Sequence, residues 1–517
     1  MRKLRIGVLD LVSKAPTRSL WARVMHANLA SIMPQAVAVW CEEAGHDVRL
    51  ICFTGLEDLE RELPSDLDLV FIGAFTQAAQ LAYALSHLFR RRGAVTVLGG
   101  PHARCYPDDA RHYFDYVLGF TDKSVIDNVL DECLTHRTYG AYLSAKHQPL
   151  NLPSVAKRWK YIEPTLRKAP TRLKAVPMLA SLGCPYNCSF CIDSTVGYQP
   201  FDADAVASDL RFIVEKMPQA WVGWHDPNFG VRFSDSLSAI ERGAPQGPLT
   251  FIAESSLSLL SEPNLKRMRN AGFKALLPGI ESWYTLGGKS KTGSSRGIDK
   301  VGKISAHVNM MFEHIPYIQT NFVLGLDTDE GEEPFELTKR FLDKTPGAFP
   351  GYSLLTAFGE AAPLNLELQR DNRVLPFPFH FLNNNQAMNV RPKNYEWPEF
   401  YDRVIDLTEY SFSWRAIARR ARANRPAFAR WLNVVRAISS EGFGRIKYYK
   451  TVRRLLDTDR SLRRFFDGES SVVPSFYVDR IKRDLGAFWQ YLPPGALNHD
   501  PNAYFKKTTT QAAVAAS

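Results

Sequence analysis

The chain has 517 residues, of which 45% are hydrophobic and 23% are charged. This composition excludes a disordered or fibrous protein, and the length favours two or three domains. The first apolar run stops at Asp10 without the cleavage site of a signal peptide, so we expect a cytoplasmic protein whose thiols stay reduced. The net charge of +10 is concentrated between Ser411 and Phe466, where fifteen Lys or Arg face three Asp or Glu.

Short apolar runs alternate with helix-length amphipathic stretches over residues 1–135. Continuous apolar strands joined by helical crossovers are typical of a parallel sheet that is covered on both faces. We therefore predict a doubly wound, Rossmann-like α/β domain whose ligand binds beyond the carboxyl ends of the strands. The expected strands are 4–11, 48–53, 67–75, 95–100 and 116–120, and the expected helices include 31–45 and 78–93.

Residues 136–175 are polar and interrupted by prolines, which predicts a linker. A second series of strand and helix patterns then covers 176–395. Six such units predict a partial (βα)6 barrel with its site at the carboxyl ends of the strands. The expected strands are 176–183, 220–226, 249–255, 273–282, 317–326 and 352–358, with helices at 202–217 and 261–272 between them.

Strand patterns stop after about Pro398. Residues 396–505 are predicted to form a mostly helical, basic C-terminal region, and residues 506–517, KKTTTQAAVAAS, a disordered tail. The predicted fold is therefore an N-terminal parallel sheet domain, a partial barrel and a helical C-terminal region.

Three cysteines, Cys184, Cys188 and Cys191, lie in 180-ASLGCPYNCSFCIDS-194 with the spacing C-x3-C-x2-C, directly after the first barrel strand. Three thiolates can hold three irons of a 4Fe–4S cube and leave the fourth iron open to another ligand. Structural zinc usually takes four ligands, for which His225 is a conceivable addition. A chance triplet of structural cysteines is the remaining alternative. The other cysteines show no paired spacing and are interpreted as small buried hydrophobic residues: Cys41, Cys52, Cys105 and Cys133.

The cysteine motif, with Phe190 before its third cysteine, resembles that of the radical S-adenosylmethionine (SAM) enzymes. The resemblance implies that Cys184, Cys188 and Cys191 bind a 4Fe–4S cluster. It also implies that SAM chelates the open iron and that Phe190 belongs to the cofactor site. Reductive cleavage of SAM would then yield methionine and a 5′-deoxyadenosyl radical.

Four downstream segments resemble the parts of this family that surround SAM. They are WHDPNF (224–229), PGIES (278–282), NFVLGLDTDE (321–330) and residues 354–375, and Asp327 stands where the family has a proline. The implied SAM contacts come from Asp226, Asn228, Glu281, Ser282 and Gly325. Two alternatives stay open from the residues alone, because Asp226 could cap the following turn and Glu281 could pair with a surface Arg.

Residues 95–120, VTVLGGPHARCYPDDARHYFDYVLGF, resemble the second half of a cobalamin-binding domain. Glycines at a strand end permit a bulky ligand to approach the backbone, although a plain glycine turn is the alternative. The D-x-H-x-x-G motif, whose histidine coordinates cobalt, is absent. Radical SAM members without it bind cobalamin with no protein histidine, and its absence also fits a domain that has lost the cofactor. The implied cobalamin contacts are Thr76, Gly99, Gly100, Pro101 and His102.

The two-domain resemblance implies a cobalamin-dependent radical SAM enzyme that methylates an unactivated carbon through methylcobalamin and a 5′-deoxyadenosyl radical. One alternative is a cobalamin-dependent cyclase or rearrangement enzyme without methyl transfer. A second is a basic scaffold that binds nucleic acid or membranes. Enzymes of tRNA methylthiolation share the barrel, but their second cysteine triplet and C-terminal RNA-binding barrel are not visible here.

The expected partners are a small-molecule or lipid-like substrate and an external electron donor of the flavodoxin or ferredoxin type, with no nucleic acid. The segment 415–438 places Trp, Phe, Leu and Val among arginines. This pattern predicts amphipathic helices that pack on the barrel. Alternatives are peripheral docking on the inner face of an anionic membrane and electrostatic attraction of an anionic substrate.

Overall fold

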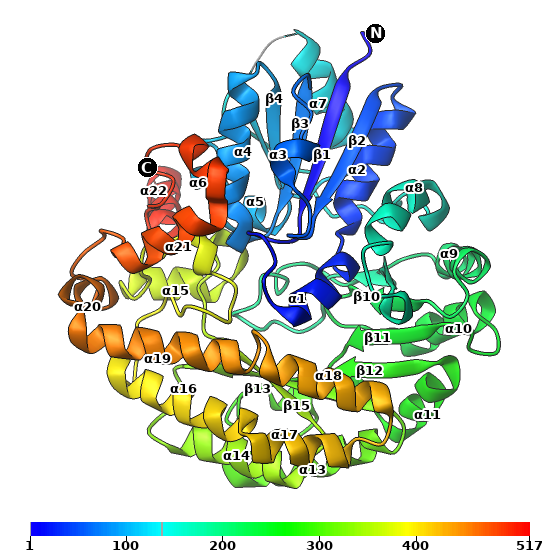
Figure 1. Ribbon diagram of the computed structural model, residues 1–517, viewed down its shortest axis with the longest axis vertical. Coiled ribbons are helices and arrows are strands. Elements are labelled where there is room, and N and C mark those ends of the chain that lie inside the picture. Colours follow the sequence, from blue (N-terminus) through cyan, green and yellow to red (C-terminus); the bar gives the residue numbers. More distant parts are fainter. Residues whose placement is uncertain (1, 136–137, 517) are drawn as a thin grey trace.

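The computed structural model describes residues 2–135 and 138–516 and contains two large parallel sheets surrounded by helices (Figure 1). The N-terminal sheet has the order β2-β1-β3-β4-β5-β6, so the five predicted strands are confirmed and a sixth is added. The strands are β1 (Arg5–Leu11), β2 (Asp47–Phe53), β3 (Leu69–Ala74), β4 (Val95–Gly99), β5 (Tyr116–Leu118) and β6 (Ala141–Leu143).

The central strands of this sheet are buried because helices cover both faces. Helices α2 (Ile32–Glu43) and α7 (Lys123–Thr135) pack on one face, where Val8 and Phe71 are buried. Helix α4 (Ala79–Arg91) packs on the other. The strand order reverses between β1 and β3, which is the position where doubly wound sheets bind ligands at their carboxyl edge.

The second sheet is the predicted partial barrel, and every pairing within it is parallel. Its ladder begins at β7 and ends at β15, which pairs only with β14. The strands are β7 (Ala175–Met178), β10 (Trp221–Trp224), β11 (Thr250–Glu254), β12 (Phe273–Leu277), its continuation β13 (Gly279–Glu281), β14 (Tyr317–Leu324) and β15 (Phe349–Leu354).

Two predicted barrel strands differ from the structure. The last strand begins at Phe349, three residues before the expected 352–358. The first strand, expected at 176–183, divides in two. The chain leaves the barrel after Met178, and β8 (Ser181–Leu182) pairs antiparallel with β9 (Gln199–Pro200), which encloses the cysteine loop between them.

The helices around the barrel follow the predicted pattern. Asp202 caps the first of them by accepting a hydrogen bond from the Ala205 N–H at 3.0 Å, and Gly272 ends the third in a left-handed conformation. These helices are α9 (Ala203–Lys216), α10 (Phe233–Gly243), α11 (Glu262–Ala271), α13 (Gly297–Phe312), α14 (Glu333–Lys344) and α15 (Leu364–Arg370).

The predicted linker 136–175 contains regular structure, which corrects the prediction. Strand β6 pairs with β5, and helix α8 (Val155–Leu166) packs between α2 and α9. A three-residue strand and a polar helix that contains Pro164 give weak sequence signals. Residues 136–137 of the predicted linker lie outside the described residues.

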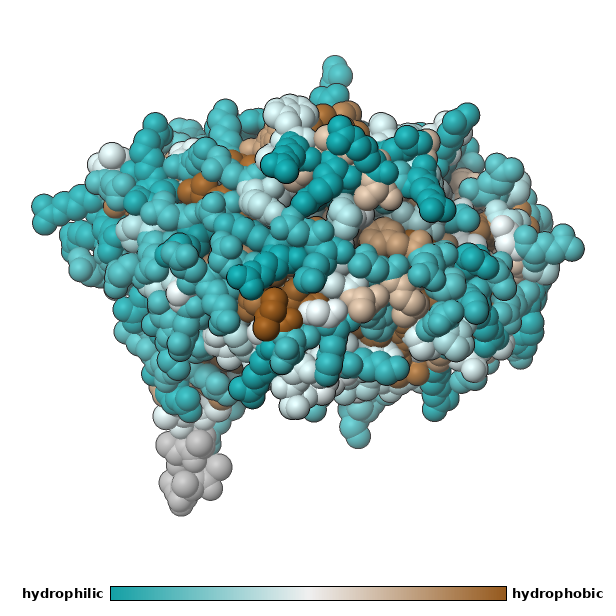
Figure 2. Space-filling model, turned by 90° about the horizontal axis from the view of Figure 1, so that it is seen from below, coloured by the Kyte–Doolittle hydropathy of each residue, from teal (hydrophilic) through white to brown (hydrophobic). Residues whose placement is uncertain are grey.

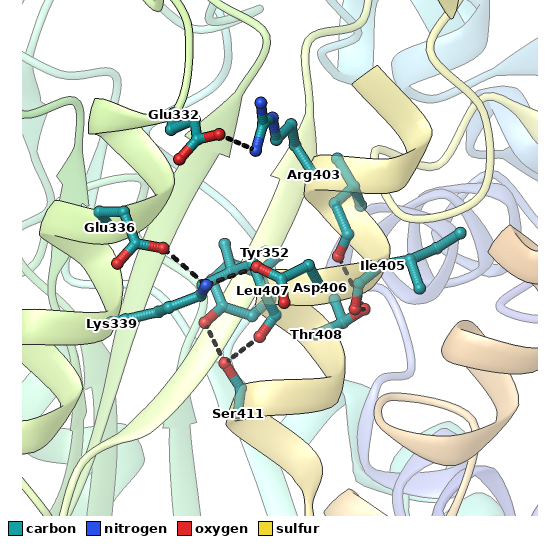
Figure 3. Close-up of polar contacts among 11 residues, drawn as sticks. Glu332, Glu336, Lys339, Tyr352, Arg403, Ile405, Asp406, Leu407, Thr408 and Ser411 are labelled. Atoms are coloured by element: carbon teal, nitrogen blue, oxygen red, sulfur yellow. Dashed lines mark hydrogen bonds and ion pairs between the residues drawn. The ribbon is translucent and has the colours of Figure 1, made fainter. Parts of the chain in front are cut away.

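The C-terminal region is helical, as predicted, and it docks on the barrel through polar contacts (Figure 3). Lys339 of α14 pairs with Glu336 at 2.7 Å and with Asp406 of α16. The hydroxyl groups of Tyr352 and Ser411 lie 2.7 Å apart. The helices are α16 (Trp397–Phe412), α17 (Trp414–Ala423), α18 (Ala427–Ile438), α19 (Phe443–Thr458), α20 (Arg460–Phe466) and α21 (Ser475–Leu485).

Helix α18 contacts strands on both sides of the opening in the barrel ladder. The Phe428 ring lies 5.8 Å from Trp221 of β10, between ring centroids. Arg436 lies over the Phe349 ring of β15 at 4.1 Å and donates a 2.6 Å hydrogen bond to the Tyr317 hydroxyl. The basic segment 415–438 therefore packs on the barrel, and Arg436 is one of the arginines that make this contact.

The end of the chain returns to the N-terminal domain (Figure 1). Helix α22 (Ala503–Ala516) occupies most of the segment predicted to be a disordered tail, and Ser517 lies outside the described residues. Lys507 pairs with Glu360 at 2.9 Å and with Asp108 at 3.1 Å, so the helix is anchored to both domains. Within residues 2–135 and 138–516, no helix has the length and apolarity needed to cross a membrane.

Candidate functional site

The carboxyl edges of the two sheets face one cavity of about 670 Å³. This volume lies in the range of ligand pockets, which are typically a few hundred to about 1,000 Å³. The N-terminal domain contributes Gly73, Phe75, Gln77, Gly99, Gly100, Pro101 and Arg104, and the barrel side contributes Leu182, Gly183, Asp193, Trp224, His225, Asp226 and Glu254.

The three cysteines lie on the tight loop that β8 and β9 enclose. Gly183, which precedes Cys184, has a φ of +69°, and a Cβ there would lie 2.4 Å from the carbonyl oxygen of Val196. Only glycine fits this turn. The Cys184 N–H donates to Val196 O at 3.2 Å, and the Cys191 N–H donates to Cys188 O at 2.9 Å. The loop thus brings together all three predicted ligands, and all three are free thiols.

Burial and nearby polar groups act in opposite directions on the ionisation of these thiols. Burial raises the pKa of Cys191 to about 11 and also raises the pKa of Cys188. The nearby Lys289 ammonium opposes these increases without cancelling them. The Asp193 N–H donates to Cys191 Sγ at 3.4 Å. Such a thiol needs a cation to ionise, and bonding to iron provides one.

Across the described ranges 2–135 and 138–516, no three His, Cys, Asp or Glu side chains converge on a single metal ion. A zinc ion held by the triplet and His225 would require such convergence. Three cysteines that each bind a different corner of a cube do not have to meet at one point. The preference for the cluster rests on the spacing and motif of the three cysteines.

Asp226 supports the strand that leads into the cysteine loop. Its side chain is buried, with the residue 2% exposed. It accepts hydrogen bonds from the Ala180 N–H at 3.0 Å and from the Ser181 hydroxyl at 2.6 Å. Burial raises its pKa to about 6 despite these hydrogen bonds. Asp226 therefore lines the cavity and fixes residues 180–181, instead of capping the turn that follows it.

Asn228 and Ser282 are engaged within the barrel edge. The Asn228 side-chain oxygen accepts a hydrogen bond from the Ser256 N–H at 2.8 Å, which ties the ends of β10 and β11 together. The Ser282 hydroxyl accepts from the Tyr284 N–H at 3.1 Å. Neither residue lines the cavity, and Phe190 is partly buried against the core. SAM contact by these three residues stays a prediction.

The turn after β14 differs from the family pattern but is well held. Gly325 has a φ of +85°, and its N–H donates to Asp329 at 3.0 Å. Asp327, which stands where the family has a proline, forms two 2.8 Å hydrogen bonds with Arg373. A carboxylate cap and a two-point ion pair thus hold the turn.

Glu281 forms an ion pair at the end of β13. Its carboxylate lies 2.7 Å from Lys289, a largely buried lysine and not the surface Arg considered from the sequence. Burial alone would lower the pKa of Lys289, but Glu281 and the nearby cysteines raise it above its usual value. Sequence reasoning missed Lys289, although it follows the G-I-E-S segment in a glycine-rich run, GGKSKTG.

The N-terminal edge of the cavity combines backbone at two glycines with side chains such as those of Phe75 and Gln77. Space is open around the position where a Gly99 Cβ would lie. Gly100 has a φ of +91°, and a Cβ there would lie 2.9 Å from Ala74 O. Gly99, Gly100 and Pro101 line the cavity, whereas Thr76 is buried beside it, and cobalamin contact by these residues stays a prediction.

His102 lies away from the cavity, which corrects its prediction as a cobalamin contact. Helix α5 (Pro101–Cys105) turns Pro101 and Arg104 to the cavity and His102 to the opposite face, as expected for residues three apart. The His102 Nε2 lies 2.7 Å from the Tyr83 hydroxyl, and burial lowers its pKa to about 3.

Two cavity residues were not assigned a cofactor role from the sequence. His225 and Glu254 stand at the ends of β10 and β11, and in the described part of the chain neither side chain has a hydrogen-bond partner. Both side chains are exposed to the cavity, and desolvation by the surrounding protein lowers the pKa of His225 to about 4. Burial and the neighbouring Glu281 raise the pKa of Glu254. Their positions as the last residues of predicted strands were the available signal.

No protein-family model matches the chain. Two curated relatives come from Chlorobaculum tepidum. Bacteriochlorophyllide d C-12(1)-methyltransferase is 24% identical over 362 residues, which cover 69% of this chain and 77% of that relative. Bacteriochlorophyllide d C-8(2)-methyltransferase is 25% identical over 309 residues, which cover 57% of this chain and 66% of that relative, just under two thirds.

Solved structures share the architecture at low sequence identity. The radical SAM methyltransferase TsrM from Kitasatospora setae, with cobalamin and a 4Fe–4S cluster bound, has a TM-score of 0.52 and 14% identity, covering 72% of this chain and 75% of TsrM. The cobalamin-dependent SAM radical enzyme OxsB with aqua-cobalamin bound has a TM-score of 0.54 and 11% identity, covering 99% of this chain and 84% of OxsB. The fold is that of the cobalamin-dependent radical SAM enzymes. The predicted fold, a Rossmann-like domain followed by a partial barrel and a helical C-terminal region, is therefore confirmed.

Proposed function

We propose that this chain is a cobalamin-dependent radical SAM enzyme that methylates an unactivated carbon. The observation that carries the proposal is the single cavity in which the cysteine-loop edge of the barrel faces the glycine edge of the N-terminal sheet. The names of both curated relatives, which are C-methyltransferases, support methyl transfer as the reaction. TsrM has also been solved with a tryptophan substrate and a SAM analogue, which supports a small-molecule substrate.

The residues of the cysteine loop fit a 4Fe–4S cluster. Cys184, Cys188 and Cys191 would hold it, since all three are free and lie on one constrained loop. The Asp193 N–H and the Lys289 ammonium would stabilise negative charge on the sulfurs. The proposed neighbours of SAM are Phe190, Asp226, Asn228, Glu281, Ser282 and Gly325.

The N-terminal edge fits cobalamin. No atom of the described residues, apart from its chain neighbours, lies within 4 Å of the position that a Gly99 Cβ would take, so this space is open to a ligand and any side chain at residue 99 would occupy it. The cavity continues between α2 and the sheet as an apolar slot, which would suit the flat apolar base of cobalamin. No histidine from the described residues of the N-terminal domain lines this cavity, which fits a corrinoid held without a protein histidine. The slot is lined by Val8, Ile32, Met33, Pro34, Val37 and Phe71.

When bound, the reduced cluster supplies the electron that cleaves SAM to a carbon-centred radical, and cobalamin supplies the methyl group. The protein positions these groups and excludes water.

Anaerobic reconstitution with iron, sulfide and cobalamin tests the proposal. We expect a visible spectrum of both cofactors and, on reduction, formation of 5′-deoxyadenosine together with S-adenosylhomocysteine from SAM. The first product without the second would favour the cyclase alternative. A chain that binds neither iron nor corrinoid would contradict the proposal and leave the scaffold alternative.

We also propose that the C-terminal helices touch an anionic membrane, which would place the protein on the inner membrane face. A groove of about 800 Å³ between α16, α17 and α19 is lined by Phe412, Trp414 and Phe443, and Trp414 is 68% exposed. Lys447 and Arg454 border it and have no acidic partner among the described residues. Figure 2 views the molecule from below, the end at which Figure 1 places α17, and shows hydrophobic residues among hydrophilic ones. An apolar surface beside unpaired cations is typical of interfacial helices.

Vesicle sedimentation tests this contact. We expect binding to phosphatidylglycerol-containing vesicles that weakens with salt, and no binding to phosphatidylcholine alone. Trp414→Ala and Lys447→Glu should weaken it, whereas Arg211→Glu, an exposed charge on α9, should not. Absence of binding at low salt would contradict the membrane contact and leave the methylase proposal intact.

We also propose that an external electron donor, a flavodoxin or a ferredoxin, reduces the cluster.

A further inference from the structure

Arg104 of helix α5 reaches from the N-terminal domain to the cysteine loop. Its guanidinium donates to Ile192 O at 3.0 Å and lies 3.5 Å from the Asp193 carboxylate. It also stacks over the Phe120 ring at 4.8 Å, and its side chain is only 14% exposed. The same Asp193 donates its N–H to Cys191. One side chain from the glycine edge thus holds the residues next to the third cysteine.

The residues after Arg104 contact a second segment of the barrel. The Tyr106 hydroxyl donates to Ala357 O at 2.9 Å. Gly359 has a φ of +47° and packs so closely that a Cβ would lie 1.7 Å from Cys105 O. The end of α5 is therefore fixed against residues 357–361, part of the segment that the family resemblance places around SAM.

The two barrel segments also contact each other. The Leu364 N–H donates to Ser189 O at 2.9 Å, and Ser189 lies between Cys188 and Cys191 in the chain. The helix α5, the cysteine loop and residues 357–364 therefore touch pairwise. A shift of any one of them breaks contacts to both others, which is the condition for rigid coupling across a domain boundary.

We propose that Arg104 is a positioning residue that couples occupation of the glycine edge to the geometry of the cysteine loop. Its forked guanidinium contacts a carbonyl and a carboxylate of the same loop at once, which a point charge on a flexible stem does less well. The proposal rests on the proposed function, because the coupled groups are the corrinoid and the cluster with SAM. Coupling of this kind is reciprocal, so each cofactor would raise the affinity for the other.

Hydrogen exchange of the full chain without cofactors tests the contact itself. Arg104→Gln should raise amide exchange in the peptide that covers 189–194, and Arg104→Lys should raise it less. Arg111→Gln is the matched control, because Arg111 donates to Gly140 O within the N-terminal domain. Exchange in 189–194 that is unchanged by Arg104→Gln would overturn the proposal whether or not cofactors bind.

Corrinoid affinity of the cluster-loaded chain, measured with and without SAM, tests the coupling. We expect SAM to tighten hydroxocobalamin binding by ~5-fold or more in the wild type, the lower end of typical couplings. Arg104→Gln should bring this ratio to about one, and Arg111→Gln should keep it. A wild-type ratio retained in Arg104→Gln would overturn the inference. A wild type that binds no corrinoid would refute the proposed function instead, and the exchange experiment would then decide the role of Arg104.

Discussion

The two sheet edges that face the cavity are both carboxyl ends of parallel strands, yet they are built differently. The N-terminal edge presents backbone at Gly99 and Gly100, and its nearby His102 points away. The barrel edge presents side chains, and hydrogen bonds or ion pairs hold them, as at Asp226 and Glu281.

This difference follows from what each edge would hold. A large ligand needs open space, and any side chain there would compete with it for that space. A metal cluster needs ligand atoms, which only side chains such as thiols supply. Removing a side chain should therefore damage the barrel edge most, and adding one should damage the N-terminal edge most.

The largest expected effect is at the cysteines. Cys188→Ala should remove the cluster and reduce SAM cleavage by more than ~10³-fold, because the three ligands act as a unit. Iron content and 5′-deoxyadenosine formation measure it. Cys133→Ala, outside the site, is the control. Retention of a full cluster in Cys188→Ala would break the assignment of the barrel edge.

The converse change is Gly99→Leu. A leucine fits the local backbone but fills the cavity, so corrinoid affinity should fall by at least ~100-fold through steric conflict. Reductive SAM cleavage should persist. Gly302→Leu, which adds the same side chain in open space on α13, should leave corrinoid affinity unchanged. Wild-type affinity in Gly99→Leu, read from corrinoid titration, would show that the ligand does not approach this edge.

A smaller, pH-dependent effect is expected at Asp226. Its pKa is raised to about 6 in the folded chain from 3.8, so the folded state holds the proton more tightly than the unfolded state. The contribution of this proton to the stability of the folded state is fully present below about pH 4, and it is lost as the pH rises through about 6. An asparagine does not titrate, so Asp226→Asn lacks this pH dependence. Between about pH 4 and pH 6 the free energy of unfolding of the wild type should therefore fall by between about 1 and 3 kcal/mol relative to that of the variant. Melting temperatures of the cofactor-free proteins at a series of pH values measure it, and parallel curves would contradict the buried, proton-binding carboxyl.

The strand–helix repeats could be predicted because fully buried strands are continuously apolar and their helices are amphipathic. The cysteine loop could be located because its spacing is specific and a strand precedes it. Residues 141–143 and 155–166 were missed, because a three-residue strand and a polar helix carry little periodicity. The tail was missed because its helix is anchored by Lys507, a contact distant in sequence.

Side-chain directions at the site were harder to predict than positions. Pro101 and His102 are adjacent in one motif, but the helix that begins there sends them to opposite faces. The partner of Glu281 lies eight residues on, in the four-residue helix α12 (Gly287–Ser290), whose glycine-rich sequence carries no helical periodicity. Arg104 and Asp193 meet only because two domains pack together, and a single sequence carries no local signal of that contact.

The smallest expected effect is removal of a side chain from the N-terminal edge. Gln77 lines the cavity beside Phe75, and its side chain has no hydrogen-bond partner within the described residues. Gln77→Ala should change corrinoid affinity by less than about 3-fold, the scale of substitutions that break no held contact. Titration of the cluster-loaded chain, with Gly99→Leu as the opposite extreme, measures it. A loss of tenfold or more would mean that this edge also holds its ligand through side chains, and the contrast between the two edges would disappear.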